Sequence, residues 1–297
     1  LPGSPLTFGP WALFPNPWPA LHGHTFTFHL PAAWLSGQVQ LEALLYEPGP
    51  LTQPLERRVA IVAFNDVPPL DVKIVPLNYF DGTNTCQALS HDEISDYLLR
   101  LYPVHQVRVS FHAPYEFATP ITSYDDWLKL LGTLYSLKLA EGAPFSQVYY
   151  GLVPERNEDG YCTVGGPAGV GIVGNRIAAG VTGTIPGDFD ASSTGRLAAH
   201  EIGHALGLLH TPCGTTDGDP DFPYPDGSIH FYGYDVMRNK LLNPGAPDYA
   251  KDLMGYCGSD WISDYHYRKV YEAQRTNKQM LAQTEGQDVL LIRAYLE

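Results

Sequence analysis

The segment His200-Glu-Ile-Gly-His204-Ala-Leu-Gly-Leu-Leu-His210 constrains this chain more than any other stretch. On an α-helix, positions i and i+4 lie on one face, so His200 and His204 can contact the same metal ion. Glu201 lies on the adjoining face, where it can reach a water at that ion. Gly207 favours a sharp helix end, because glycine accepts the left-handed backbone conformation of such an exit. The chain can then bring in His210 as a third ligand.

Three protein ligands leave one position of a zinc ion open, which is the catalytic arrangement and not the closed structural one. We therefore predict one Zn²⁺ held by His200, His204 and His210, with Glu201 as the general base for a zinc-activated water. The alternative is a helix on which histidines stack by coincidence. That alternative is much less favoured here than for a shorter motif, because five positions, three His, one Glu and one Gly, are fixed at set spacings.

This segment resembles the long signature of the metzincin clan of zinc endopeptidases, which is followed by a Met-turn. The second half of that signature matches Asp252-Leu-Met254-Gly-Tyr256-Cys257. The resemblance implies that Met254 forms a hydrophobic floor beneath the zinc histidines. It also implies that Tyr256 is an additional weak zinc ligand and a donor to the oxyanion of the reaction. Met237 is the competing candidate for the Met-turn, and a tyrosine that is only packed is the alternative for Tyr256.

The resemblance strictly covers about residues 194–270, and no subfamily is assigned. It implies an α+β fold, a two-lobed zinc protease domain with a mixed twisted sheet, a backing helix, an active-site helix and a C-terminal helix. A Gly-rich segment, 165–184, is expected to line the cleft as a strand that binds the substrate peptide. Residues 258–264 are expected to set the cleavage preference.

Hydrophobic periodicity and capping residues indicate the elements of this domain. The predicted helices cover 90–102, 123–140, 194–209 and 263–283, with a long loop over 211–250. The predicted strands cover 70–77, 106–111, 148–153, 170–173 and 177–181.

The first part of the chain differs from the rest. Residues 1–66 are β-rich, with strands predicted at 25–30, 38–46 and 59–64, and they resemble part of an immunoglobulin-like β-sandwich. Residues 67–297 are expected to form the catalytic domain. Residues 288–297 are strand-like, and belong either to a flanking β domain or to a strand that returns to the N-terminal ones.

Four cysteines are present, and an even number in an acidic chain rich in Pro and Gly favours an exported protein with two disulfides. Reduced thiols are the alternative. Cys213 closely follows His210, and Cys257 closely follows Met254, so both are expected near the zinc. We favour Cys213–Cys257 and, by exclusion, Cys86–Cys162, while the other two pairings stay open. Cys213 as a zinc ligand is disfavoured, because three His and a water already fill a catalytic site.

The formal net charge is −14, from 18 Lys and Arg against 32 Asp and Glu. That sign disfavours nucleic acid and anionic membrane surfaces as partners. No apolar run approaches the roughly 20 residues that span a bilayer. The cysteines lead us to expect a secreted protein, and the metzincin resemblance implies a protein or glycoprotein substrate. We also expect a monomer that does not insert into a membrane.

Two further patterns carry less weight. Gly169-Val-Gly171-Ile-Val-Gly174 has the spacing of a dinucleotide-binding turn, but no helix is predicted to open from it. Asp217-Gly-Asp219-Pro-Asp221 hints at a Ca²⁺ loop, for which a solvated acidic loop is the favoured alternative. Isolated histidines, His266 among them, are assigned no role.

The leading functional hypothesis is a secreted zinc endopeptidase with Glu201 as general base. The second is a protease-like binding module that grips protein or glycoprotein surfaces with weak or no turnover. The presence of Glu201 and of all three histidines argues against lost turnover. The third is a different zinc amide hydrolase, which would need a pocket closed at one end.

Overall fold

A computed structural model describes residues 34–45, 56–88, 93–154, 156–157, 160–182, 194–235, 237–238, 240–244 and 250–281. The chain divides into two units between Asn65 and Asp66. The strands predicted at 25–30 and 288–297 lie outside the described residues, as does the start of the helix predicted from residue 90.

The described part of the first unit is a two-stranded antiparallel ladder. β1 (Gly37–Leu45) pairs with β2 (Glu56–Phe64) in unbroken register. β2 begins earlier than the predicted strand 59–64. The β-sandwich stays a prediction.

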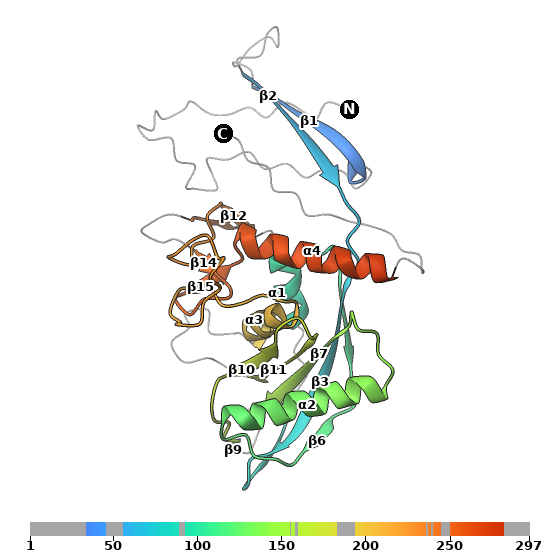
Figure 1. Ribbon diagram of the computed structural model, residues 1–297, viewed down its shortest axis with the longest axis vertical. Helices are drawn as coiled ribbons and strands as arrows, with labels where there is room; N and C mark the ends of the chain where they lie inside the picture. The colour runs from blue at the N-terminus through green and yellow to red at the C-terminus, as the bar shows by residue number, and fades with distance from the viewer. Residues whose placement is uncertain are drawn as a thin grey trace. The chain divides into compact units, whose positions relative to one another are not determined.

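The second unit is built on a twisted mixed sheet (Figure 1). Its long central strand pairs with several shorter ones, and three of its neighbours run parallel to it. The strand at the end of the sheet path, beyond β11, runs antiparallel to β11. The sheet order is β10 (Gly169–Ile172), β11 (Ile177–Thr182), β7 (Val148–Pro154), β3 (Leu70–Phe80) and β4 (Thr85–Gln87), with β5 (Val107–Phe111) and β6 (Tyr115–Phe117) also on β3.

Helices cover both faces of this sheet. Helix α2 (Tyr124–Ala140) lies on one face, as Figure 1 shows, while α1 (Glu93–Leu101) and α3 (Thr194–Ala205) lie on the other. Successive strand residues alternate between the two cores, because side chains of a strand point to opposite faces. In β3, Ile74 joins the core with α1 and α3, whereas Val75 joins the core with α2. The predicted α+β class with a mixed sheet is confirmed.

Helix α2 shows why its boundaries could be predicted. Ser123 is its N-cap, and the Asp126 side chain accepts the Ser123 backbone N–H at 3.1 Å, which completes a capping box. The observed helix agrees with the predicted 123–140.

The segment that precedes the last helix contains short strands, so the long loop predicted over 211–250 is wrong in part. A buried ion pair holds the antiparallel strands at 233–235 and 240–242, with Arg100 of α1 donating to Asp235 at 2.5 Å. Strands of two or three residues have too little periodicity to be seen in sequence. In the predicted loop these are β12 (Gly233–Asp235) and β13 (Lys240–Leu242). The other short strands are β8 (Arg156–Asn157), β9 (Gly160–Tyr161), β14 (Lys251–Asp252) and β15 (Ser259–Trp261), and the last helix is α4 (Asp264–Leu281).

Two disulfides cross-link the second unit. The structure pairs Cys86 with Cys162 and Cys213 with Cys257, at Cα separations of 6.1 and 5.8 Å. This confirms the pairing that the sequence analysis favours. Disulfides persist in oxidising compartments, so the pairs are consistent with an extracellular location.

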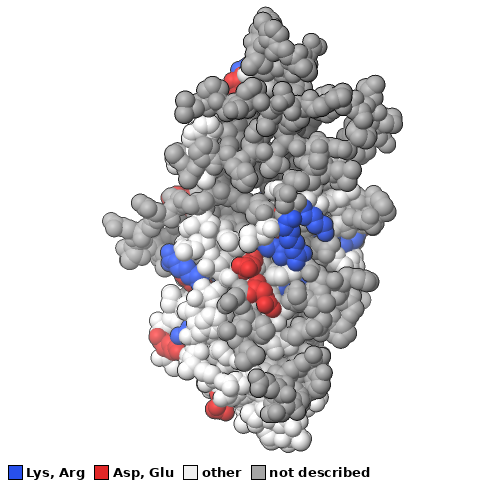
Figure 2. Space-filling view, turned by 180° about the vertical axis from the view of Figure 1, so that it is seen from behind, with Lys and Arg blue, Asp and Glu red and all other residues white. Residues whose placement is uncertain are grey.

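None of the described helices is both long and apolar enough to cross a membrane. On the face that Figure 2 shows, basic side chains of the described residues lie next to acidic ones, so the charge on that face is mixed.

Candidate metal centre

Helix α3 carries His200 and His204 on one face, and both side chains are buried. Small residues let the helix approach its neighbours closely. A Cβ atom at Gly203 would lie only 2.7 Å from the Met254 Sδ atom. Met254 is itself fully buried, so its thioether packs directly on the backbone of α3. Met237, the competing candidate for the Met-turn, is 59% exposed.

The end of α3 sets the direction in which the chain leaves the helix. The Leu208 N–H donates to the Gly203 carbonyl at 3.0 Å, and the Gly207 N–H donates to the His204 carbonyl at 2.8 Å. Gly207 has φ 104°. These two bonds and the left-handed glycine form a Schellman motif, which stops the helix at Ala205. The helix is therefore shorter than predicted, because glycine ends it before the last leucines.

Backbone carbonyls orient the two helical imidazoles. The His200 Nδ1 atom lies 2.8 Å from the Leu253 carbonyl, and the His204 Nδ1 atom lies 2.8 Å from the Leu208 carbonyl. A carbonyl only accepts, so the hydrogen of each ring is on Nδ1 and the Nε2 lone pair is free. The Schellman motif thus supplies the acceptor that fixes His204.

The third histidine is oriented by a carboxylate. The His210 Nδ1 atom lies 3.2 Å from Asp217 Oδ1, and Asp217 also accepts from the Thr215 hydroxyl. Sequence reasoning placed Asp217 in a candidate calcium loop and missed this contact. The available signal was a carboxylate seven residues after the last histidine, since carboxylates commonly orient ligand histidines.

The three imidazoles converge. Each offers one ligand atom, and these atoms all lie within 4.8 Å of one another. His204 Nε2 and His210 Nε2 are 3.1 Å apart. Within the described ranges, this is the one group of three or more His, Cys, Asp or Glu residues that could hold a metal ion.

The protonation of this group suits a cation. Burial lowers the pKa of His200 to about 3 and that of His204 to about 4, so both rings are neutral near pH 7. The Nε2 atoms of His204 and His210 face each other at 3.1 Å, and a metal ion between them would use both as ligands. Neutral imidazole nitrogens are the ligands zinc prefers. The donor set therefore fits a zinc ion.

Glu201 lies beside these ligands and is 5% exposed. Burial raises the pKa of its carboxyl to about 8. A Cβ atom at Gly169 would lie 2.8 Å from Glu201 Oε1, and one at Gly171 would lie 2.3 Å from the Glu201 carbonyl oxygen. Strand β10 can thus approach α3 only with glycine at these positions. The structure gives two glycines of the Gly-x-Gly-x-x-Gly stretch a packing role against the metal centre.

Tyr256 reaches the centre from the Met254 turn. Its ring is 59% exposed, and its hydroxyl lies 2.7 Å from His210 Nε2. Partial burial raises the pKa of the phenol to about 12, so the group keeps its proton near neutral pH and acts as a donor.

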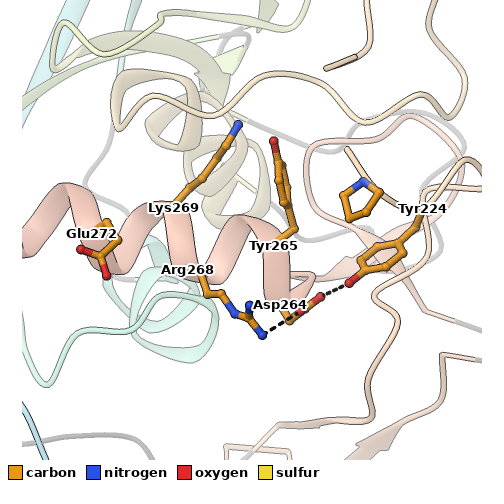
Figure 3. Close-up of a pocket in the computed structure, with 7 residues that line it drawn as sticks. Tyr224, Asp264, Tyr265, Arg268, Lys269 and Glu272 are labelled. Atoms are coloured by element: carbon orange, nitrogen blue, oxygen red, sulfur yellow. Dashed lines mark hydrogen bonds and ion pairs between the residues drawn. The ribbon is translucent and has the colours of Figure 1, made fainter. Parts of the chain in front are cut away.

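The loop after His210 is fixed to helix α4. Asp219 accepts from Lys269 Nζ at 2.7 Å and from the Tyr265 hydroxyl at 3.0 Å. Figure 3 shows a second attachment, in which Tyr224 and Arg268 both point to Asp264. A pocket of about 410 Å³ beside the first turns of α4 is lined by side chains that include Tyr224, Asp264, Tyr265, Arg268 and Lys269. The loop that carries Asp217 is therefore held in place from the α4 side.

Residues 147–284 match the family model Peptidase M66. No curated protein matches the chain. The matched range includes the three histidines, Glu201 and the Met254 turn, and it supports a peptidase of a metallopeptidase family. The geometry of the histidines is compatible with a zinc site in such an enzyme.

The close approach of β10 to α3 gives a first prediction. Gly171→Ala is expected to destabilise the protein by about 1–3 kcal/mol, because the new Cβ atom overlaps the Glu201 backbone and β10 must move. Urea unfolding measures the effect. The control is Gly132→Ala in α2, where a Cβ atom meets nothing within 4 Å and which should stabilise by about 0.5–1 kcal/mol. Equal behaviour of the two variants would contradict the proposed packing.

Proposed function

We propose that this protein is a secreted zinc endopeptidase of the metzincin type. In this proposal His200, His204 and His210 are the zinc ligands and Glu201 is the general base. The observation that carries it is the convergence of three imidazoles beside a buried glutamate, within a segment that matches Peptidase M66. The Nδ1 anchors of the histidines support it, because they leave each Nε2 atom for a metal.

When bound, Zn²⁺ supplies Lewis-acid activation of water and of the scissile carbonyl. Glu201 takes a proton from the water and delivers it to the leaving amine. Its carboxyl, a weak acid when buried alone, becomes a stronger acid beside a cation, so it starts the reaction ionised. The Tyr256 hydroxyl donates a hydrogen bond to the oxyanion that develops on the carbonyl.

In this proposal the substrate peptide binds along strand β10. This strand stands at one end of the sheet path, paired with β11 on one side. No other described strand pairs with its outer side. An extended peptide can add to such an edge through main-chain hydrogen bonds. Because β10 lies directly against Glu201 and His204, a peptide on that edge would run past the metal centre.

The test is hydrolysis of a denatured protein such as casein, together with the zinc content of the purified chain. We expect one zinc per chain, cleavage at internal peptide bonds, and loss of cleavage with a chelator that prefers transition metals to Ca²⁺. Zn²⁺ should restore the activity and Ca²⁺ should not. Bound zinc without any cleavage would favour the protein-binding module, and a chain without zinc would contradict the proposed centre.

A further inference from the structure

A buried carboxylate lies at the centre of the Met254 turn. Asp252 is fully buried and accepts three hydrogen bonds. The Met254 N–H donates to Asp252 Oδ1 at 2.8 Å, and the Ser263 N–H donates to Asp252 Oδ2 at 2.7 Å. The third donor is the ring of His266, with its Nδ1 atom 2.8 Å from Asp252 Oδ1. The carboxylate therefore joins the turn to the start of α4.

The bond to Met254 reaches the metal centre through a single peptide group. The Met254 N–H and the Leu253 carbonyl belong to the same planar unit, and they point in opposite directions across it. Asp252 holds the N–H end, while the carbonyl end accepts from His200 Nδ1 at 2.8 Å. A rotation of that peptide group would break both hydrogen bonds together.

The rest of the turn closes around this unit. The Gly255 N–H donates to the Asp252 carbonyl at 3.0 Å. The Thr211 N–H, in the segment just after His210, donates to the Met254 carbonyl at 3.0 Å. The Met254 turn thus contacts the side chain of His200 through the Leu253 carbonyl. It also contacts the backbone just after His210 through the Met254 carbonyl.

We propose that Asp252 is a positioning residue of the metal centre, which holds His200 in its ligating orientation through the Leu253–Met254 peptide group. This inference rests on the proposed zinc site. Nothing in it requires Asp252 to touch the metal or the substrate. His266 supports the carboxylate by donating from Nδ1, and its own Nε2 atom is buried without a hydrogen-bond partner.

The chain contains a matched control for this role. Asp235 is also buried, it also accepts the N–H of a methionine two residues on, at 3.0 Å, and it pairs with buried Arg100. That methionine, Met237, is exposed, and the Nδ1 atoms of the three histidines contact Leu253, Leu208 and Asp217 instead. Asp235 therefore offers a buried carboxylate in a comparable hydrogen-bonding role, in a segment that supplies none of these three Nδ1 partners.

The first experiment compares Asp252→Asn with Asp235→Asn. An amide has one acceptor oxygen for three donors, so both variants should lower the midpoint of thermal unfolding. Only Asp252→Asn should weaken zinc binding, by about 10–100-fold, the usual effect of losing a group that orients a ligand. Zinc affinity is measured by competition with a chromophoric chelator. Equal zinc affinities in the two variants would overturn the proposal.

A second readout needs no metal. In the metal-free protein, the ¹⁵N spectrum of the imidazoles reports whether the His200 hydrogen is on Nδ1. We expect that signal to be kept in Asp235→Asn and lost or shifted in Asp252→Asn, and an unchanged signal in both would overturn the proposal. A wild-type chain that binds no zinc would contradict the zinc peptidase, while this comparison would still decide the role of Asp252.

A second pair of variants covers the case in which Asp252→Asn does not fold. In His266→Asn the amide nitrogen takes the place of Nδ1 and can still donate to Asp252, whereas in His266→Gln it takes the place of Nε2. Both lose the ring that packs against Phe222. We expect His266→Asn to bind zinc close to wild type and His266→Gln to bind it more weakly. Equal affinities would count against the positioning role.

Discussion

Glu201→Gln is expected to bind zinc as the wild type does and to hydrolyse protein about 10²–10⁴-fold more slowly, the usual range for loss of a general base. Glutamine has the same shape as glutamate but no basic oxygen that can take a proton from water. The side chain is 5% exposed and lies against the β10 backbone, so an isosteric change should leave the packing intact. Steady-state kinetics and zinc content of the same sample measure both effects.

Two outcomes would contradict this expectation in different ways. A variant with the wild-type rate would place the general base elsewhere. A variant that loses zinc would make Glu201 a contributor to metal binding. Glu272→Gln is the matched control, since the side chain is 64% exposed on α4 and should change neither rate nor zinc content.

The sequence was most informative where a local pattern carries its own geometry. Histidines at i and i+4 require a helix, and Gly207 requires a sharp end, so the convergence of three imidazoles followed from spacing alone. The Ser123 cap likewise determined the start of α2. The pairing of Cys213 with Cys257 followed from the expected nearness of two motifs. For the histidines and the cap, a few neighbouring residues contain the whole constraint. The two cysteines are 44 residues apart, and their expected nearness came from the resemblance of the Met254 segment to a Met-turn.

The parts that sequence did not predict depend on partners far apart in the chain. Asp252 pairs with His266 at the start of α4. Arg100 of α1 pairs with Asp235 of β12, which is 135 residues later in the chain. Neither pair has a spacing that periodicity can detect. The two β10 glycines illustrate the same limit, because their function is to admit a helix that begins far later in the sequence.

The stability of the metal-free protein should depend on pH through the side chains of His200, His204 and Glu201. The pKa of His200 is lowered to about 3 and that of His204 to about 4, from 6.5, whereas the pKa of Glu201 is raised to about 8 from 4.5. Between about pH 4.5 and 6.5 the unfolded chain therefore binds two imidazole protons that the folded chain does not. In the same window the folded chain keeps one carboxyl proton that the unfolded chain has released.

The two effects oppose each other. The free energy of unfolding rises with pH wherever the unfolded state binds more protons, by about 1.4 kcal/mol per pH unit for each proton. The histidines therefore make the folded state less stable as pH falls through this window, and Glu201 makes it less stable as pH rises. In the wild type the three groups together leave the unfolded state with one extra proton, so they make the free energy of unfolding rise by about 1.4 kcal/mol per pH unit. Other titrating groups contribute equally to all variants.

Two substitutions should change that slope in opposite directions. Glu201→Gln removes the opposing carboxyl, so its free energy of unfolding should gain about 1.4 kcal/mol per pH unit relative to the wild type between pH 4.5 and 6.5. His204→Asn removes one imidazole, so its slope should fall below the wild type by about the same amount. Urea unfolding of the chelator-treated proteins at several pH values measures both. Parallel curves for all three proteins would mean that these side chains are not buried as the structure places them.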